Sequence, residues 1–389
     1  MIIIHIYSKY PILMISSHHL LIIGPLPPPY IGPAAATQQL INSTTLKSHF
    51  TIQCLDIGDR HGLTGIGQFN AHNIFQAFYH CCKFIKVIIS NRPDVIYISI
   101  ARGFWGFIRD AVFLINARVL RIPTVVHLRA GRFDIMHDDG WLGKYIAKKI
   151  LSGVTRGVVL SENLKLVFQD LIYEDKIRVV ANGIDISDNW DSNDDYNGNT
   201  IFTVLCLANM FQDKGTHVLI QAASILLNKG HDFHIIFAGD WLGNEYKNYC
   251  MLLIKEYGLH SHIHFAGVVD GQEKKKLLQS ADIVVFTPTK PEGMPWVVLE
   301  AMAAAKPVIG TPQGAMPEMI QHEKTGLLIA PENPQELSDA IYQLIQNPEL
   351  KTIMGRNARK RIDEYYNTSV THQQLLSVLQ EAINVYRKK

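Results

Sequence analysis

The sequence predicts an α/β fold made of two Rossmann-like, doubly wound domains. Short runs of β-branched and aliphatic residues alternate with helical patterns, and this alternation is broken once near the middle of the chain. The apolar runs are continuous, which is typical of parallel strands that helices bury on both faces. A chain of 389 residues is long enough to form two such domains.

Six strands are expected before the break and six after it. They are His19–Ile23, Phe50–Leu55, Val95–Ile100, Thr124–Leu128, Gly157–Leu160, Ile177–Val180, Ile201–Leu207, His234–Ala238, Ile263–Phe265, Ile283–Phe286, Pro307–Gly310 and Thr325–Ile329. Helical patterns such as His217–Lys229 and Gln335–Gln346 lie between them. This β-α alternation indicates open, doubly wound sheets.

The break is the segment Asp185–Thr200, DISDNWDSNDDYNGNT. It is polar, contains glycine and asparagine, and has no hydrophobic period, which indicates a linker. Each half of the chain is large enough for a core of its own. Because open α/β sheets bind ligands at the carboxyl ends of their strands, we expect the chemistry where the two domains face each other.

Composition excludes several classes of protein. Apolar residues make up 47% of the chain and charged residues 19%, which excludes intrinsic disorder. The net charge is only +2, from 37 basic and 35 acidic residues, so we expect no nucleic-acid partner. The five cysteines form no C-x-x-C pair, which favours a reducing compartment without disulfides or a zinc ribbon.

The first residues, 1–17, are apolar but are interrupted by Lys9 and Pro11. The run is shorter than a membrane-spanning helix needs. It also lacks the basic start and the small-residue cleavage site of a signal peptide. We therefore expect neither a transmembrane helix nor an export signal here.

The segment Thr287–Ile320 carries the strongest functional signal. A Pro/Gly loop follows the strand that ends at Phe286, and a helix is expected from about Pro295 to Ala305, with Pro295 in its first turn. The free N–H groups and the positive dipole end of such a helix suit a phosphate group. Gly293 allows the backbone to approach a ligand closely.

Two carboxylates flank the start of this helix. Glu292 lies in the loop, where it can accept hydrogen bonds from sugar hydroxyls. Glu300 lies in the apolar helix VVLEAMAAA, where burial is costly unless a group such as the vicinal hydroxyls of a ribose donates to it. The plain alternatives are a loop carboxylate for Glu292 and a salt bridge or an exposed position for Glu300.

The spacing from Glu292 to Glu300 resembles the E-x7-E motif of retaining glycosyltransferases of the GT-B fold, in particular glycosyltransferase family 4 (glycosyl transferases group 1). The segments EAMAAAKPVIGT, GAMPEMI and HEKTGLLIAPENPQELSDAI resemble further motifs of that family. Upstream, VVLSENLK and VVANGID (Val179–Asp185) also resemble family motifs. The resemblance extends over most of the chain and is weakest before Leu20.

The resemblance implies a role for each matching residue. Glu292 would contact hydroxyls of the donor sugar, and the backbone of Gly293 and Met294 would face the sugar and the β-phosphate. Glu300 would hold the ribose of the donor.

The segment Leu205–Gly215, LCLANMFQDKG, resembles the family's VGRLxxxKG. Lys214 therefore matches the lysine that neutralises the donor diphosphate and stabilises the leaving nucleotide. Its plain alternative is a solvated loop lysine.

Three positions depart from the family pattern. Asn209 replaces an arginine that usually makes a second diphosphate contact; as a donor-binding candidate, asparagine can hydrogen-bond a phosphate but cannot neutralise it. Pro295 replaces the second glycine of the common EGxG, which removes one backbone N–H. The Gly-Gly loop that closes over the donor is represented by Gly32 alone, within Pro29–Pro33, and Gly32 can also be a plain turn glycine.

His127, which ends the strand in IPTVVHLRAG, resembles the family histidine that lies near the reacting sugar. A histidine there can donate to a sugar hydroxyl or handle a proton. The alternative is a histidine satisfied within the core. Arg129 and Arg132 follow it and are candidate contacts to an anionic acceptor.

No Asp-x-Asp occurs in the chain, and that motif usually holds the divalent ion of metal-dependent glycosyltransferases. We therefore expect no metal and no other cofactor, with the nucleotide-diphosphate-sugar as a substrate. The resemblance implies retention of the anomeric configuration by front-face attack, in which the leaving phosphate accepts the acceptor's proton. No enzymic nucleophile is assigned.

The resemblance also implies a division of the chain. It comprises an N-terminal extension 1–17, an acceptor-side domain 18–186, a linker 187–200, a nucleotide-sugar-binding domain 201–365, and a C-terminal helix 366–389 that packs back toward the N-terminal domain.

The acceptor implied by the resemblance is a glycan or a lipid-linked glycan, in cell-surface polysaccharide biosynthesis. We expect a cytoplasmic protein at the inner face of the plasma membrane, with the segment 102–121 as a peripheral membrane contact or, alternatively, as a buried Rossmann helix. Two other functions stay open: a nucleotide-sugar epimerase of the same fold and a non-catalytic sugar-binding protein. A dehydrogenase is disfavoured, because Gly62–Gly67 reads GLTGIG and not G-x-G-x-x-G.

Overall fold

The computed structural model describes residues 18–58, 71–136, 140–186, 190 and 201–387. The extension 1–17, almost all of the expected linker 187–200 and the segment Gly62–Gly67 lie outside the described residues.

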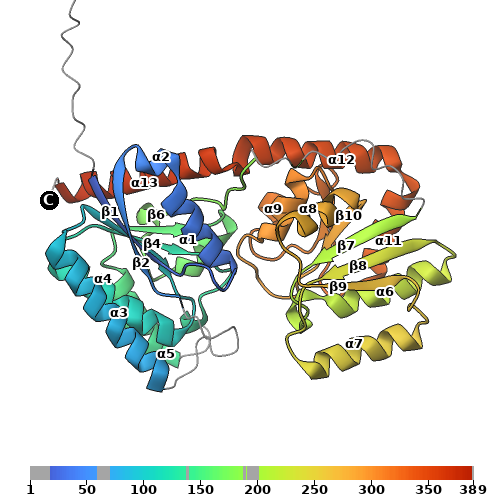
Figure 1. Ribbon diagram of the computed structural model, residues 1–389, viewed down its shortest axis with the longest axis horizontal. Helices are drawn as coiled ribbons and strands as arrows, with labels where there is room; N and C mark the ends of the chain where they lie inside the picture. The colour runs from blue at the N-terminus through green and yellow to red at the C-terminus, as the bar shows by residue number, and fades with distance from the viewer. Residues whose placement is uncertain (1–17, 59–70, 137–139, 187–189, 191–200, 388–389) are drawn as a thin grey trace, which may run out of the picture.

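Two parallel six-stranded sheets organise the described part of the chain (Figure 1). Their strand orders are β2-β1-β3-β4-β5-β6 and β12-β11-β10-β7-β8-β9, and all neighbouring strands are parallel. The strands are β1 (His18–Gly24), β2 (Phe50–Asp56), β3 (Val95–Ile100), β4 (Thr124–Leu128), β5 (Arg156–Val159), β6 (Ile177–Val179), β7 (Phe202–Leu207), β8 (Phe233–Ala238), β9 (Ile263–Gly267), β10 (Ile283–Phe286), β11 (Val308–Gly310) and β12 (Gly326–Leu328). Each expected strand is present, and the predicted fold of two Rossmann-like domains is confirmed.

Helices cover both faces of each sheet. They are α1 (Gly32–Asn42), α2 (Thr44–Lys47), α3 (Ala71–Ser90), α4 (Phe104–Val119), α5 (Gly140–Leu151), α6 (Thr216–Asn228), α7 (Asn244–Glu256), α8 (Gly271–Ser280), α9 (Trp296–Ala303), α10 (Met316–Met319), α11 (Pro334–Gln346), α12 (Pro348–Arg361) and α13 (Thr368–Arg387). Within the described residues, none of them is both long and apolar enough to cross a bilayer.

Alternate residues of each strand supply the two cores of the N-terminal domain. Leu20 and Ile22 of β1 pack with α13, whereas Leu21 and Ile23 pack with the layer of α3, α4 and α5. This explains why the strand sequences are continuously apolar. The segment 102–121 forms α4, whose Phe107, Asp110, Ala111, Phe113, Leu114 and Ala117 are buried.

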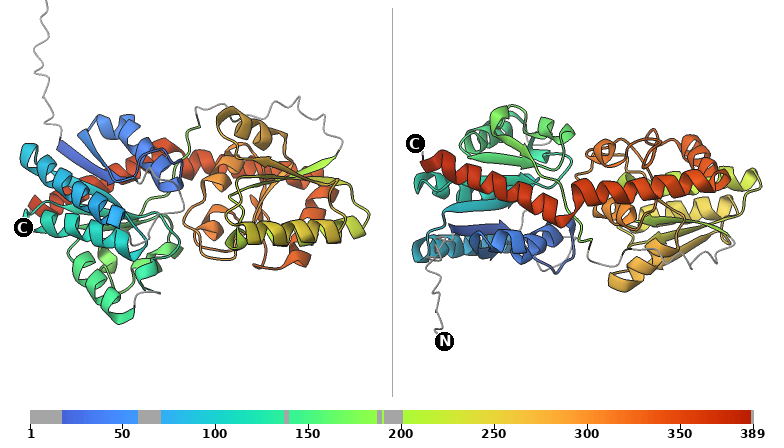
Figure 2. Two further views of the ribbon diagram at one scale, coloured as in Figure 1. Left: turned by 60° about the horizontal axis from the view of Figure 1, so that its bottom comes forward. Right: turned by 90° about the horizontal axis from the view of Figure 1, so that it is seen from above.

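The chain returns to the N-terminal domain through its last helices. Figure 2 shows α12 and α13 running along one side of both domains. They are joined by a π-helical turn, Ile362–Tyr366, and the backbone of Ile184 bonds to Tyr366 O at 2.8 Å and to Thr368 N at 3.0 Å. The chain passes between the domains near Ile184 and again near Tyr366–Thr368, and these two segments therefore lie side by side.

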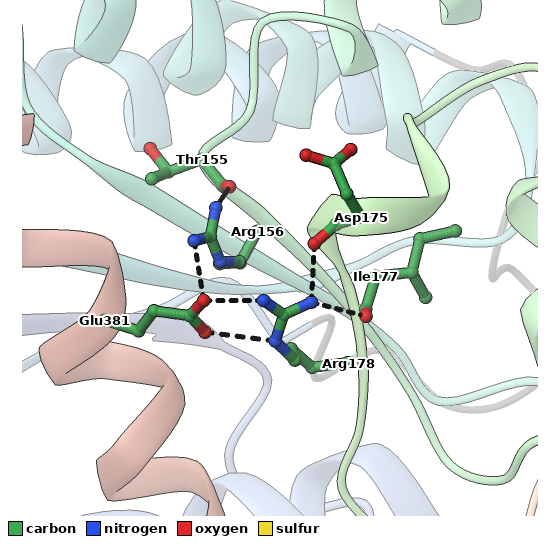
Figure 3. A network of polar contacts seen from close by, with 6 residues as sticks. All are labelled: Thr155, Arg156, Asp175, Ile177, Arg178 and Glu381. Carbon is green, nitrogen blue, oxygen red and sulfur yellow. Dashed lines mark hydrogen bonds and ion pairs between the residues drawn. The ribbon is translucent and has the colours of Figure 1, made fainter. Parts of the chain in front are cut away.

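Glu381 of α13 fastens this helix to the N-terminal sheet (Figure 3). It accepts hydrogen bonds from Arg156 Nη2 at 2.7 Å and from Arg178 Nη2 at 2.5 Å. These bonds lower the pKa of Glu381 to about 2, and the bond from Arg156 has the largest effect.

Candidate functional site

The loop between β10 and α9 lies at the carboxyl edge of the C-terminal sheet and contacts the N-terminal domain. Pro295 is the N-cap of α9 and not its first helical residue, because its ψ of 125° is extended, although its carbonyl accepts the hydrogen bond of Val298 N–H at 3.2 Å. The expected helix therefore begins one residue later and ends at Ala303. A loop in this position can present side chains to both domains.

Glu292 and Lys214 form an ion pair in this loop region. Lys214 Nζ lies 2.5 Å from Glu292 Oε1, and the two side chains are 18% and 24% exposed. Lys214 belongs to a 3₁₀ turn after β7, and its Nζ also lies 5.3 Å from the centre of the Phe286 ring. The ammonium group is thus held in place while part of it stays accessible.

The backbone after Lys214 requires a glycine. Gly215 has φ of 73°, and a Cβ atom on it would lie 2.2 Å from Thr287 O. The 3₁₀ turn is also tied to the β10 loop by the hydrogen bond from Thr289 N to Asp213 O, 2.9 Å long. The positions of Lys214 and of the Glu292 loop are therefore coupled.

Glu300 lies on α9 with its carboxylate largely buried, and it is paired with a lysine that the sequence analysis missed. Lys274 of α8 places its Nζ 2.5 Å from Glu300 Oε1. Burial raises the pKa of Glu300, whereas Lys274 lowers it. The salt-bridge alternative considered for Glu300 is therefore the state seen here.

Backbone atoms of the two domains come very close around Glu292. A Cβ atom on Gly131 would lie 2.5 Å from the carbonyl of Glu292, and a Cβ atom on Gly293 would lie 3.2 Å from Arg129 O. Gly314, with φ of 59°, approaches Glu292 O from the C-terminal side. The Glu292 loop is therefore enclosed between backbone segments of both domains.

Met294 is buried and receives two contacts from Asn182, which the sequence analysis did not select. Asn182 Nδ2 donates to Met294 O at 2.8 Å, and Asn182 N–H donates to Met294 Sδ at 3.2 Å. Arg129 Nη1 in turn donates to Asn182 Oδ1 at 2.5 Å. A continuous set of hydrogen bonds therefore connects Arg129, after β4, to the loop that precedes α9.

His127 lies at the end of this set and is fully buried. Its Nδ1 is 2.9 Å from the hydroxyl of Tyr97, which also accepts a hydrogen bond from Arg129 Nη2 at 3.0 Å. Because Arg129 already donates to the Tyr97 oxygen, we assign the hydroxyl proton to the bond with Nδ1 and the imidazole proton to Nε2. Among the described residues, Nε2 has no hydrogen-bond partner. Burial, and then the charge of Arg129, lower the pKa of His127, so the ring is neutral near pH 7.

Three further residues that the sequence predicted for the site, Asn209, Arg132 and Gly32, each make different contacts. Asn209 is exposed, and its side chain accepts the hydrogen bond of Asp240 N–H at 3.2 Å. Arg132 is paired with Asp134 at 2.6 Å. Gly32 begins α1, and a Cβ atom there would lie 3.3 Å from the Trp296 ring, so Gly32 does lie next to the start of α9 across the domain boundary.

The structure thus brings together Gly32, Arg129, Lys214, Glu292, Gly293 and Met294 around the start of α9. Glu300 lies further along the same helix, paired with Lys274. His127 connects to this group through Tyr97 and Arg129. Lys274 could not have been singled out, because it is one of three successive lysines in α8. Asn182 carried a signal, since it stands in the VVANGID motif.

Comparison with known proteins finds similarity to glycosyltransferases. Residues 192–361 match the family model for glycosyl transferases group 1. An uncharacterized glycosyltransferase of Methanocaldococcus jannaschii is 29% identical over 224 residues, which cover 55% of this chain and 54% of the relative. The capsular polysaccharide biosynthesis glycosyltransferase CapM of Staphylococcus aureus is 24% identical over 78% of this chain and 81% of its own. For several relatives, the matched region spans only about half of the relative's length.

Solved structures show the same fold over nearly the whole chain. A glycosyltransferase from Rickettsia africae superposes with a TM-score of 0.77 at 19% identity and covers 95% of this chain and 99% of its own. HepE of Anabaena, solved with UDP and glucose, superposes with a TM-score of 0.72 at 19% identity, over 93% of this chain and 99% of its own. The chain therefore has the GT-B fold of these glycosyltransferase structures, and its sequence similarity to glycosyl transferases group 1 lies in residues 192–361.

Proposed function

We propose that this protein is a retaining, metal-independent glycosyltransferase that moves a hexose from a nucleotide-diphosphate-sugar to a glycan or lipid-linked acceptor. The observation that carries the proposal is the Lys214–Glu292 pair at the carboxyl edge of β7 and β10, pressed against the N-terminal domain. An accessible ammonium group beside a helix N-terminus suits a diphosphate. The neighbouring carboxylate suits the hydroxyls of the sugar attached to it.

Each side chain has a defined task in this proposal. Lys214 turns from Glu292 toward the diphosphate and stabilises the negative charge that grows there as the glycosidic bond breaks. Glu292 is then free to accept hydrogen bonds from the sugar. Glu300 exchanges part of its bond with Lys274 for ribose hydroxyls, which satisfies a carboxylate that is costly to leave buried.

The N-terminal domain supplies the acceptor side in this proposal. The unpaired Nε2–H of neutral His127 is a donor for a hydroxyl of the reacting sugar. Arg129 holds the chain of bonds to Asn182 and the Glu292 loop, and Arg132 is a further candidate for an anionic acceptor. The leaving phosphate takes the acceptor's proton, so no side chain has to act as a nucleophile.

The acceptor and the place of the reaction are inferred from a relative and from the exposed side of α4. The name of the capsular polysaccharide relative supports a role in cell-surface polysaccharide biosynthesis. We propose that the reaction takes place on the cytoplasmic side of the plasma membrane. Of the segment 102–121, only one side of α4 is available for membrane contact, because six of its residues are buried in the domain.

The proposal is tested by donor turnover. A thermal-shift screen with UDP-, GDP- and ADP-sugars identifies the donor, because a ligand that binds the native state raises the melting temperature. With that donor and an acceptor glycan, we expect release of the nucleoside diphosphate, activity unchanged by EDTA, and a product whose anomeric configuration matches the donor by NMR.

Other outcomes of the same assay reject the proposal. An epimerase would change the sugar without an acceptor, and a binding protein would show a thermal shift with no turnover. An inverted product or loss of activity in EDTA would contradict the retaining or the metal-independent part alone.

A further inference from the structure

Helix α3 carries two apolar stripes, and only one of them faces the core. Phe84 and Ile88 are buried against the sheet. A second set, at intervals of three or four residues, is exposed and lies along one side of the helix. This outer stripe consists of Phe75, Phe78, Cys82, Ile85 and Ile89, with Phe75 69% and Ile89 80% exposed.

Helix α5 presents an outer face of the same kind. Trp141 is 78% exposed, and Leu142 and Tyr145 are exposed beside it. Figures 1 and 2 show α3, α4 and α5 in one helical layer on the same side of the N-terminal sheet. Ile115 and Val119 of the intervening α4 are also exposed. Large apolar side chains are therefore gathered on the outer side of this layer. Soluble proteins rarely expose such a group of apolar residues unless a partner covers it.

The charged residues of α3 and α5 all have the same sign. Both helices contain lysines and neither contains an aspartate or glutamate. The exposed lysines are Lys83, Lys86, Lys144, Lys148 and Lys149. Among the described residues, none of the five has a carboxylate partner. Two of them lie over tyrosine rings of their own helix, Lys83 over Tyr79 and Lys149 over Tyr145.

Helix α7 of the C-terminal domain also has exposed apolar residues, but its charged residues are of both signs. It also exposes Leu252 and Tyr249, but the exposed Glu245 and Glu256 stand on the same helix. The absence of acidic residues thus distinguishes α3 and α5 from α7.

We propose that the outer faces of α3 and α5 bind the surface of a bilayer that contains anionic lipids. Aromatic and aliphatic side chains enter the interface, while lysines reach the headgroups with their long side chains. Lysines that have no carboxylate partner within the described part of the chain are complementary to an anionic surface. A second copy of the chain fits less well, because a two-fold interface would place these lysines against one another.

This inference goes beyond the proposed function, because lipid binding needs neither a donor nor sugar transfer. It also places the membrane contact on α3 and α5, on either side of α4, and not on the segment 102–121 alone. The binding assay therefore gives the same answer whether or not the protein is a glycosyltransferase.

The test is co-sedimentation of the full chain with lipid vesicles. We expect about tenfold stronger partitioning into vesicles of phosphatidylcholine mixed with phosphatidylglycerol than into phosphatidylcholine alone, and loss of that difference in high salt. The double variant Phe78→Ser/Ile89→Ser should reduce binding about tenfold. A second, charge-only variant, Lys83→Gln/Lys86→Gln/Lys148→Gln, should remove the preference for the anionic lipid.

The matched control is Leu252→Ser/Lys255→Gln on α7, which changes an exposed apolar residue and a lysine elsewhere and should bind like the parent. Circular dichroism confirms that each variant is folded. The proposal would be overturned if the parent did not bind anionic vesicles, or if the double and the charge-only variants bound them as well as the parent does. Loss of binding in the α7 control would also overturn it. So would sedimentation showing that the protein is a dimer that Phe78→Ser/Ile89→Ser dissociates.

Discussion

Each carboxylate at the start of α9 is paired with a lysine from a neighbouring loop or helix. Lys214 meets Glu292, and Lys274 meets Glu300. Lys214 and Glu292 are 18% and 24% exposed, and Lys274 and Glu300 are 30% and 14% exposed, so each pair is mostly covered but keeps some contact with solvent. Such pairs keep a charged site ordered before its ligand arrives.

Replacing Lys214 or Glu300 with alanine should therefore reduce sugar transfer at least 10²-fold, the lower end for the loss of one positioned electrostatic group. The measurement is kcat/KM from the release of nucleoside diphosphate. The control is Lys229→Ala, which removes an exposed lysine paired with Asp339 away from the site. Parent-like rates in both site variants would show that the site is wrongly assigned.

Buried histidines make the stability of the protein depend on pH. Burial lowers the pKa of His372, on α13, and of His80, on α3, to about 4. Because each pKa is lower in the folded state than the usual value near 6.5, the unfolded chain takes up protons first as the pH falls. The stabilising contribution is thus fully present above about pH 6.5 and is lost between 6.5 and 4.

His372→Gln should remove up to about 3 kcal/mol of this pH dependence. The free energy of unfolding in urea, measured at pH 7.5 and 4.5, should fall less in His372→Gln than in the parent. His234→Gln, at an exposed position of β8, serves as the control and should keep the parental slope. Identical slopes in all three proteins would exclude His372 as a source of the effect.

At the scale of elements, α13 is fixed to the N-terminal sheet by a carboxylate that two arginines share. Arg156 is largely buried, so removing Glu381 would leave a guanidinium group without its acidic partner (Figure 3). We expect Glu381→Ala to lower the free energy of unfolding by roughly 1–3 kcal/mol, and Glu381→Gln by less. Urea titration measures this.

The comparison for this helix is Glu364→Ala, whose ion pair with Lys360 is exposed and 3.8 Å long. It should change stability by less than about 0.5 kcal/mol. Because the pKa of Glu381 is lowered to about 2, the contribution of Glu381 is present above about pH 4.5 and is lost as the pH falls toward 2. A difference between parent and Glu381→Ala that persisted at pH 2 would contradict this account.

The strands and the Glu292–Glu300 motif were predictable because their signals are local. Continuous apolar runs such as Val95–Ile100 report burial on both faces wherever the strand finally lies. The partner of Glu300 is different, because Lys274, Lys275 and Lys276 are equivalent in the sequence and packing of α8 on α9 selects one of them. In the same way, only the folded chain shows that Asn182 reaches Met294, 112 residues away.

At the scale of the whole molecule, the site exists only where the two domains touch. Gly131 of the N-terminal domain and Gly314 of the C-terminal domain both lie against the backbone of Glu292. Glu318 adds a further bridge, because its carboxylate accepts the backbone hydrogen bonds of Glu162 at 2.9 Å and Asn163 at 2.7 Å. The closeness of the domains thus depends on the absence of a side chain at Gly131.

Gly131→Ala should separate the two domains at this point, because its Cβ atom would lie 2.5 Å from backbone atoms that cannot yield as a side chain can. Nucleotide binding should change little, since Lys214 and Glu300 both belong to the C-terminal domain. Transfer should fall at least tenfold, because the acceptor-side residues are displaced from the donor. Gly103→Ala, where a Cβ atom would meet nothing within 4 Å, is the matched control. The thermal shift with the nucleotide measures binding, and kcat measures transfer. An unchanged kcat in Gly131→Ala would show that this contact is not needed for the reaction.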